Sequence, residues 1–138
     1  MKITICGSMS FAKEMIEYKE KLEELKHTIF VPSMLEDFIS GNINKKDEME
    51  NAARKIKYNL IIDHFNEIQK ADAILVLNFD KHEIQNYIGA NSFLEIGYAF
   101  SLSKKIYLLN DIPDMKYILA ETIAMQPIII NNNLTKIK

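Results

Sequence analysis

The segment Ala71-Asp72-Ala73-Ile74-Leu75-Val76-Leu77 contains the most apolar strand candidate in the chain. Residues 73–77 are all apolar, and a polar segment follows them from Asn78 onward. A continuous apolar run, rather than an alternating one, is typical of a strand covered by helices on both faces. The segment therefore predicts the central strand of a parallel sheet.

The segments on either side of this strand alternate between strand and helix patterns. Further strands are expected at residues 3–6, 27–31, 106–109 and 127–130, and helices at 11–26, 47–70, 92–103 and 113–125. Residues 33–46 show no sustained period and are expected to form a loop with some helix of its own. This alternation predicts a three-layer α/β, Rossmann-like domain with a five-stranded parallel sheet. The flavodoxin-like order 2-1-3-4-5 suits it best, and other orders stay open.

Length and composition indicate one globular domain, residues 1–138, with 48% apolar and 26% charged residues. The 17 basic and 19 acidic residues give a net charge of −2, which excludes the basic field of a nucleic-acid-binding protein. The short basic run at residues 54–57 is interpreted as a solvated helix face. No apolar run approaches the roughly 20 residues of a membrane span, so we expect no membrane partner.

The lone cysteine, Cys6, cannot form an intramolecular disulfide, and it has no His or Cys neighbours along the chain that would indicate a metal site. A reducing, cytoplasmic location is therefore expected, with no metal and no cofactor. His27, His64 and His82 also lack metal-ligand spacing. His64 lies on the apolar face of a predicted helix, where a packed histidine is more common than a catalytic one.

The first candidate binding loop is Gly7-Ser8-Met9-Ser10, between a predicted strand and a predicted helix. Ligands of parallel sheets bind at the carboxyl ends of the strands, and a helix start there offers free N–H groups to an anion. Gly7, Ser8 and Ser10 are therefore candidate ligands of a phosphate or a sugar hydroxyl. The alternative is a plain turn in which Ser8 or Ser10 caps the helix.

The second candidate is Glu95, which lies among apolar residues near the start of the helix expected at 92–103. A position in the first helical turn would favour its ionised form, and an ionised, sheltered carboxylate can attack an anomeric carbon. The alternative is a capping box, Ser92-x-x-Glu95, in which Glu95 only satisfies the helix start. Spacing alone slightly favours the cap.

A third loop carries Asn110 and Asp111 after the fourth predicted strand. Their place at the carboxyl edge would let Asn110 contact a base or a sugar. A turn that contains Pro113 and starts a helix is the simpler interpretation.

The residues from Ala71 to Leu77 and the segment Gly89-Ala90-Asn91-Ser92-Phe93-Leu94-Glu95-Ile96-Gly97-Tyr98-Ala99 resemble the nucleoside 2-deoxyribosyltransferase superfamily. Its typical pattern is Asp-x-Gly-Thr-x-x-Glu-x-Gly-x-Ala. Glu95 matches the nucleophile of that pattern, and Ser92 stands where the family often has Thr. Gly89 departs from the family's acidic residue, and Asn91 replaces its Gly. The superfamily includes short hydrolases of deoxynucleoside 5′-monophosphates. Gly7-Ser8 resembles the N-terminal loop with which those hydrolases bind phosphate.

The resemblance implies cleavage or transfer at the N-glycosidic bond of a (deoxy)nucleoside or its 5′-monophosphate. Glu95 would form a glycosyl-enzyme intermediate, and Asn91 and Ser92 would lie beside the substrate. A second acid would protonate the leaving base. Asp72 aligns with a family acid, whereas Asp80 is better placed on geometry, and both stay open.

Two further expectations complete the hypothesis. The helix at 92–103 is apolar nearly all round, and family members associate, so a homodimer or higher homo-oligomer is expected. The alternative function, favoured by the missing acid at Gly89, is a non-catalytic nucleotide-binding protein on the same fold.

Overall fold

The computed structural model describes residues 1–43 and 47–138. It contains one parallel sheet in the order β2-β1-β3-β4-β5. The strands are β1 (Lys2–Gly7), β2 (Thr28–Phe30), β3 (Ala73–Leu77), β4 (Lys105–Leu108) and β5 (Ile128–Ile129). All residues of β3 are buried, because β1 and β4 pair with its two edges and helices cover its two faces. The predicted fold class and strand order are confirmed.

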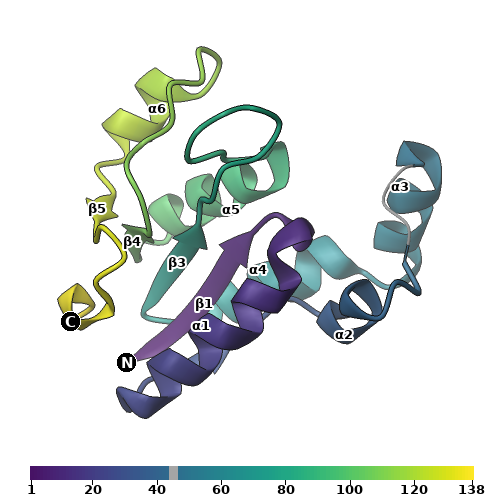
Figure 1. The fold of residues 1–138 in the computed structure, drawn as a ribbon, viewed down its shortest axis with the longest axis horizontal. Coiled ribbons are helices and arrows are strands. Elements are labelled where there is room, and N and C mark those ends of the chain that lie inside the picture. The colour runs from purple at the N-terminus through teal and green to yellow at the C-terminus, as the bar shows by residue number, and fades with distance from the viewer. Residues whose placement is uncertain (44–46) are drawn as a thin grey trace.

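Helices cover both faces of the sheet, so the domain has three layers (Figure 1). On one face, Ile3 and Ile5 of β1 pack with Met15 of α1 (Ala12–Glu24). On the other face, apolar residues of β3 and β4 pack with Ile68 of α4 (Leu60–Lys70) and Ile96 of α5 (Ala90–Ser101). Successive strand residues point to opposite faces, so Cys6 lies on the α4–α5 side. The remaining elements are η1 (Met9–Phe11), α2 (Leu35–Ile39), α3 (Glu48–Lys57), α6 (Leu119–Ala124) and η2 (Leu134–Lys136).

The long helix predicted over 47–70 is wrong, because the chain breaks it into α3 and α4. Asn59 adopts the left-handed conformation, with φ 51° and ψ 35°, which asparagine tolerates better than most residues. Helix α3 buries none of its residues, whereas α4 buries His64 and Ile68 against the sheet. The break therefore separates an exposed helix from a helix that packs on the sheet (Figure 1).

Other boundaries differ by smaller amounts. The predicted loop 33–46 contains the short helix α2, and its last three residues, 44–46, lie outside the described residues. The helix predicted over 113–125 is reduced to α6, because residues 116–118 form turns. Among the described residues, no helix is both long and apolar enough to cross a membrane.

The strand order reverses between β1 and β3, whose carboxyl ends lie side by side with Gly7 opposite Leu77. A Cβ atom on Gly7 would lie 3.2 Å from the Leu77 carbonyl oxygen and 3.2 Å from Met15 Cε. Glycine therefore permits this close approach. From this edge the chain leaves β1 toward α1 on one face and leaves β3 toward α5 on the other. Diverging connections of this kind open the crevice in which parallel sheets bind ligands.

Candidate active site

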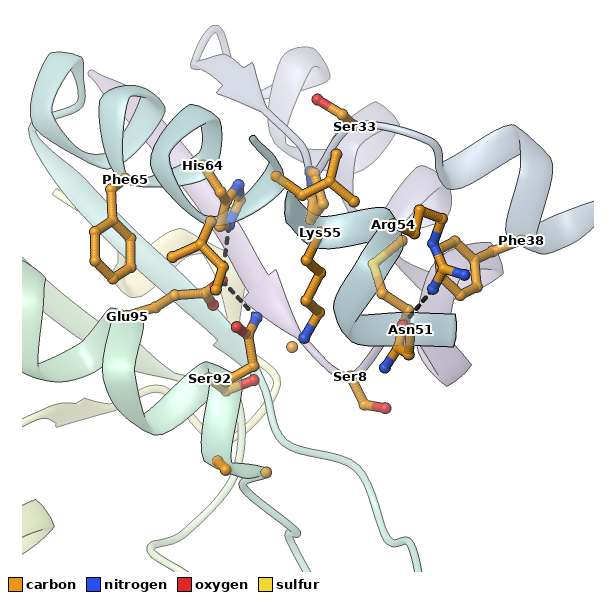
Figure 2. Close-up of a pocket in the computed structure, with 18 of the residues that line it drawn as sticks. Ser8, Ser33, Phe38, Asn51, Arg54, Lys55, His64, Phe65, Ser92 and Glu95 are labelled. Atoms are coloured by element: carbon orange, nitrogen blue, oxygen red, sulfur yellow. Dashed lines mark hydrogen bonds and ion pairs between the residues drawn. The ribbon is translucent and has the colours of Figure 1, made fainter. Parts of the chain in front are cut away.

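A cavity of about 210 Å³ opens at this switch point. Its lining comes from the loops after β1, β2 and β3, from helices α2, α3 and α4, and from the segment that leads into α5 (Figure 2). We call Cys6, His64 and Glu95 the inner end of the site. We call Ser8, Arg54, Lys55 and Lys81 its outer end.

The inner end places three chemically active groups in contact. Glu95 is 3% exposed, and its Oε1 accepts a hydrogen bond of 3.0 Å from Asn91 Nδ2. His64 Nε2 lies 3.4 Å from the same oxygen and 3.7 Å from Cys6 Sγ. Within the described residues, Glu95 Oε2 is buried and has no hydrogen-bond partner. The carboxyl group thus keeps one oxygen available for a ligand.

Burial controls the charge of the inner end. It raises the pKa of Glu95 to about 8, and the nearby Cys6 thiol, the hydrogen bond from Asn91 and the charge of Lys55 oppose the rise only in part. Burial also lowers the pKa of His64 to about 4 and raises the pKa of the Cys6 thiol. The prediction that the helix start favours the ionised form of Glu95 is therefore wrong, because burial raises its pKa. All three groups are mainly uncharged at neutral pH.

The structure also excludes the capping box at this helix. Helix α5 begins at Ala90 with Gly89 as its N-cap, and no side chain caps it. Ser92 and Glu95 accordingly lie inside the helix, so Glu95 is beyond the first turn, where the dipole acts most strongly. Glu95 is instead directed toward the cavity and His64 (Figure 2). The cap was the main structural explanation for Glu95, and its exclusion favours a functional one.

The outer end is cationic. Lys81 Nζ donates a hydrogen bond of 2.7 Å to Ser8 Oγ. Arg54 donates to Asn51 Oδ1, its guanidinium carbon lies 5.4 Å from the centre of the Phe38 ring, and its Nε has no hydrogen-bond partner in the described part of the chain. Lys55 reaches into the cavity between Arg54 and the inner end (Figure 2).

No carboxylate neutralises this outer end. Within residues 1–43 and 47–138, none of Arg54, Lys55 and Lys81 takes part in an ion pair. The prediction that Arg54 and Lys55 belong to a solvated helix face is wrong, since both are half-buried and line the cavity. Cations without partner anions in a partly closed site favour an anionic ligand.

Five of the nine predicted site residues line this cavity: Gly7, Ser8, Asn91, Ser92 and Glu95. The two acid candidates do not. Asp72 lies at the opposite, amino edge of the sheet, where its Oδ2 accepts a hydrogen bond of 2.7 Å from the Lys2 N–H. Asp80 is exposed and accepts a hydrogen bond of 2.9 Å from the Asn86 N–H. Neither carboxylate has a place beside Glu95.

Ser10 and Asn110 also lie outside the cavity. Ser8 Oγ accepts from the Ser10 N–H at 3.3 Å and caps η1, so the capping interpretation of Ser8 holds alongside its place in the lining. The Asn110 N–H donates to Oδ1 of the buried Asn78 at 2.9 Å, and its side-chain amide donates to the Asn78 carbonyl at 3.2 Å. Asn110 thus joins the ends of β3 and β4 instead of facing a ligand.

The sequence prediction missed Cys6, His64, Arg54, Lys55 and Lys81. Cys6 is isolated along the chain, and the fold alone brings it to His64 and Glu95. One available signal was helical spacing, because residues 51, 54 and 55 share a face at i, i+3 and i+4. That signal required recognising that the helix face meets a cavity and not solvent.

Comparison with solved structures finds a similar fold in a CMP N-glycosidase, BcmB, from Clostridium botulinum. The match covers 95% of this chain and 90% of that chain, with a TM-score of 0.50 and 17% sequence identity. At this identity the likeness establishes the shared fold. No family model matches the chain, and no curated protein matches it.

Proposed function

We propose that this chain cleaves the N-glycosidic bond of a (deoxy)nucleoside 5′-monophosphate, with Glu95 as the nucleophile. The observation that carries the proposal is the polarity of one cavity, which has a sheltered carboxyl group at its inner end and unpaired cations at its outer end. A nucleotide has matching polarity, with an electrophilic C1′ and an anionic phosphate. The resemblance of residues 89–99 to the deoxyribosyltransferase pattern supports the same reaction class, and so does the fold shared with a CMP N-glycosidase.

In the proposed orientation the 5′-phosphate contacts the outer end. Lys81 and Ser8 already hold one another, and Arg54 offers an Nε–H that has no partner among the described residues. Charge-assisted hydrogen bonds to a phosphate are worth about 1.5–3 kcal/mol each. The phosphate contacts lie away from the bonds that change in the reaction. Their binding energy would hold the sugar against Glu95.

The reaction follows the retaining pattern in two steps. A Glu95 carboxylate oxygen forms a bond to C1′ as the C1′–N bond breaks. The base leaves with the bonding electrons and takes up a proton from solvent, because neither Asp72 nor Asp80 lies beside Glu95. Water then attacks C1′ of the ester, releases the sugar phosphate and restores the carboxylate. A second nucleobase in place of water would give transfer. The cationic outer end favours a nucleotide over a nucleoside, and therefore the hydrolase members of the resembled superfamily.

The raised pKa of Glu95 is compatible with this role, although it reduces the fraction of molecules in which Glu95 is ionised at neutral pH. With a pKa of about 8, roughly one molecule in ten has an ionised Glu95 at pH 7. The positive charge of Lys55 favours the ionised form. A desolvated carboxylate is also less stabilised by water and attacks more readily once ionised.

A non-catalytic nucleotide-binding protein is the second candidate. The observation that favours it is that Glu95 is the sole acidic residue among the described residues that line the cavity. Retaining glycosidases generally use a pair of carboxyl groups. Incubation with a panel of nucleosides, deoxynucleosides and their 5′-monophosphates, followed by chromatography of free base, separates the two candidates. Release of base by the native chain and not by Glu95→Gln supports catalysis, whereas nucleotide binding without release supports the second candidate.

A further inference from the structure

We propose that Cys6, His64 and Glu95 form a binding site for a divalent cation of the Zn²⁺ type, and that the bound ion blocks the site. The metal-binding part of the inference stands on its own geometry. Only the blocking effect rests on the proposed function, since an ion on Glu95 occupies the electron pairs that would attack C1′.

The donor set fits zinc. A thiolate, an imidazole and a carboxylate are the three ligand types that Zn²⁺ takes in proteins. Cys6, His64 and Glu95 are all buried, and one ligand atom from each lies within 4.8 Å of the others. They come from β1, α4 and α5, so rigid elements hold them in place.

Two of the three separations between ligand atoms also match a tetrahedral ion. Zn–S bonds of about 2.3 Å and Zn–N or Zn–O bonds of about 2.0–2.1 Å, at tetrahedral angles, place S and N about 3.6 Å apart and N and O about 3.3 Å apart. The observed distances are 3.7 Å from Cys6 Sγ to His64 Nε2 and 3.4 Å from His64 Nε2 to Glu95 Oε1. The Cys6 and Glu95 ligand atoms lie within 4.8 Å of each other, so a small shift of one of these two side chains would complete the site.

An independent feature of the inner end also indicates a ligand. Glu95 Oε2 is buried without a hydrogen-bond partner in the described residues, while Oε1 is held by Asn91. A buried oxygen without a partner is unfavourable. The distances above involve Oε1, and rotation of the carboxyl group would present Oε2 to the cation while Oε1 keeps its hydrogen bond from Asn91. His64 and Glu95 both line the cavity, so a fourth coordination position would face the space where substrate binds. Three protein ligands with one open position are typical of zinc sites that exchange ligands.

Charge balance makes the exchange feasible in a buried site. The ion replaces the thiol proton of Cys6 and the carboxyl proton of Glu95, and both protons leave to solvent. Two anionic ligands, a neutral imidazole and a dication have no net charge, like the protonated cluster they replace. The nearby Lys55 opposes an isolated dication, and this neutrality reduces that repulsion.

The direct test is titration of the chelator-stripped, full-length protein with Co²⁺, followed by displacement with Zn²⁺. Cys6 is the single cysteine of the chain, so a thiolate-to-cobalt charge-transfer absorption reports on this site alone. We expect one equivalent of Co²⁺ to produce the band and Zn²⁺ to abolish it. Cys6→Ser should remove the band and His64→Gln should weaken binding at least tenfold, whereas His82→Gln, a change at an exposed histidine outside the cavity lining, should leave it unchanged.

Zinc should also raise the melting temperature of the native chain and leave that of His64→Gln unchanged. This comparison remains informative even if Cys6→Ser does not fold. Absence of the band in folded native protein, or an undiminished band in His64→Gln, would overturn the metal site.

An activity assay tests the blocking role separately. Inhibition by Zn²⁺ that a chelator reverses supports the blocking role, and full activity with the ion bound refutes it. A cobalt band in a protein that cleaves no nucleotide would sink the proposed function and leave the metal site standing.

Discussion

The inner and outer ends of the site differ in charge and in the elements that supply them. Strand β1 and the buried faces of α4 and α5 supply the inner end, where burial keeps the carboxyl, imidazole and thiol groups mainly uncharged. The exposed helix α3 and two loops supply the outer end, where three cations remain without carboxylate partners among the described residues. Substitutions at the inner end should therefore change chemistry and its pH dependence, and substitutions at the outer end should change anion binding.

The largest effect is expected at the inner end. Glu95→Gln should lower kcat/KM by at least about 10³-fold, because an amide cannot form the glycosyl ester. Its melting temperature should stay within a few degrees of the native value or rise, since a neutral side chain of the same shape replaces a buried titratable one. Activity assays paired with thermal melts measure both effects. Substantial activity in this folded variant would remove Glu95 from the mechanism.

The pH profile of kcat/KM is the next largest effect. A nucleophile must be ionised, and Glu95 has a pKa raised to about 8, so activity should climb about tenfold per pH unit between pH 5.5 and 7.5 and level off above pH 8. Lys55→Met should move this limb to higher pH, because the Lys55 charge lowers the pKa of Glu95. A profile already flat at pH 6 would show that the acting carboxylate is ionised well below that pH.

The outer end should select nucleotides over nucleosides. In calorimetric titrations of the inactive Glu95→Gln variant, a nucleoside 5′-monophosphate should bind at least about tenfold more tightly than its nucleoside. Adding Lys55→Met or Arg54→Met should remove most of that preference. Lys57→Met is the matched control, since Lys57 lies on the same helix outside the cavity lining. Equal affinity for the two ligands would contradict the phosphate assignment and favour transfer between free nucleosides.

A smaller effect concerns stability, measured by denaturant titration in chelator-containing buffer. The pKa of Glu95 is raised from 4.5 to about 8 on folding, so its contribution to stability is lost as pH rises through that range. The lowered pKa of His64 acts in the opposite direction, but only between about pH 4 and 6.5. Between pH 6.5 and 8 the free energy of unfolding should therefore fall by up to about 2 kcal/mol. Glu95→Gln should be flat over this window, and an equal slope in that variant would assign the loss to other groups.

The last expected effect is association into a homo-oligomer. Leu94 and Phe100 on α5 are 56% and 52% exposed, and together with Phe93 and Tyr98 they line an apolar groove. Burial of this surface against a second copy would stabilise at least a dimer. Light scattering at micromolar concentration should give a dimeric or larger mass, and Leu94→Glu should reduce it. A monomeric mass for the native chain would refute the association.

The fold was largely predictable because its signals are local. The run 73–77 specifies a doubly covered strand by composition alone, and the alternation around it leaves few topologies. The break at Asn59 was not predictable from periodicity, since the apolar pattern of 47–70 continues across it. A single left-handed residue ended the helix without glycine or proline as a signal.

The site was predictable where residues lie at the carboxyl ends of strands, as for Gly7, Ser8 and the segment around Glu95. The protonation state of Glu95 was not, because it depends on burial, and burial depends on packing between β1, α4 and α5. The contact between Cys6 and His64 spans 58 residues of sequence. Neither residue has a local pattern that indicates the other.

The most direct test of the central claim is detection of the glycosyl ester on Glu95. The native chain would be mixed with each active nucleoside 5′-monophosphate, quenched in acid within the first turnovers, digested and analysed by mass spectrometry. We predict a sugar-phosphate adduct on the peptide that contains Glu95, absent from Glu95→Gln and lost on longer incubation as water hydrolyses the ester. Rapid release of base with no adduct at any quench time, or an adduct on another residue, would contradict Glu95 as the nucleophile.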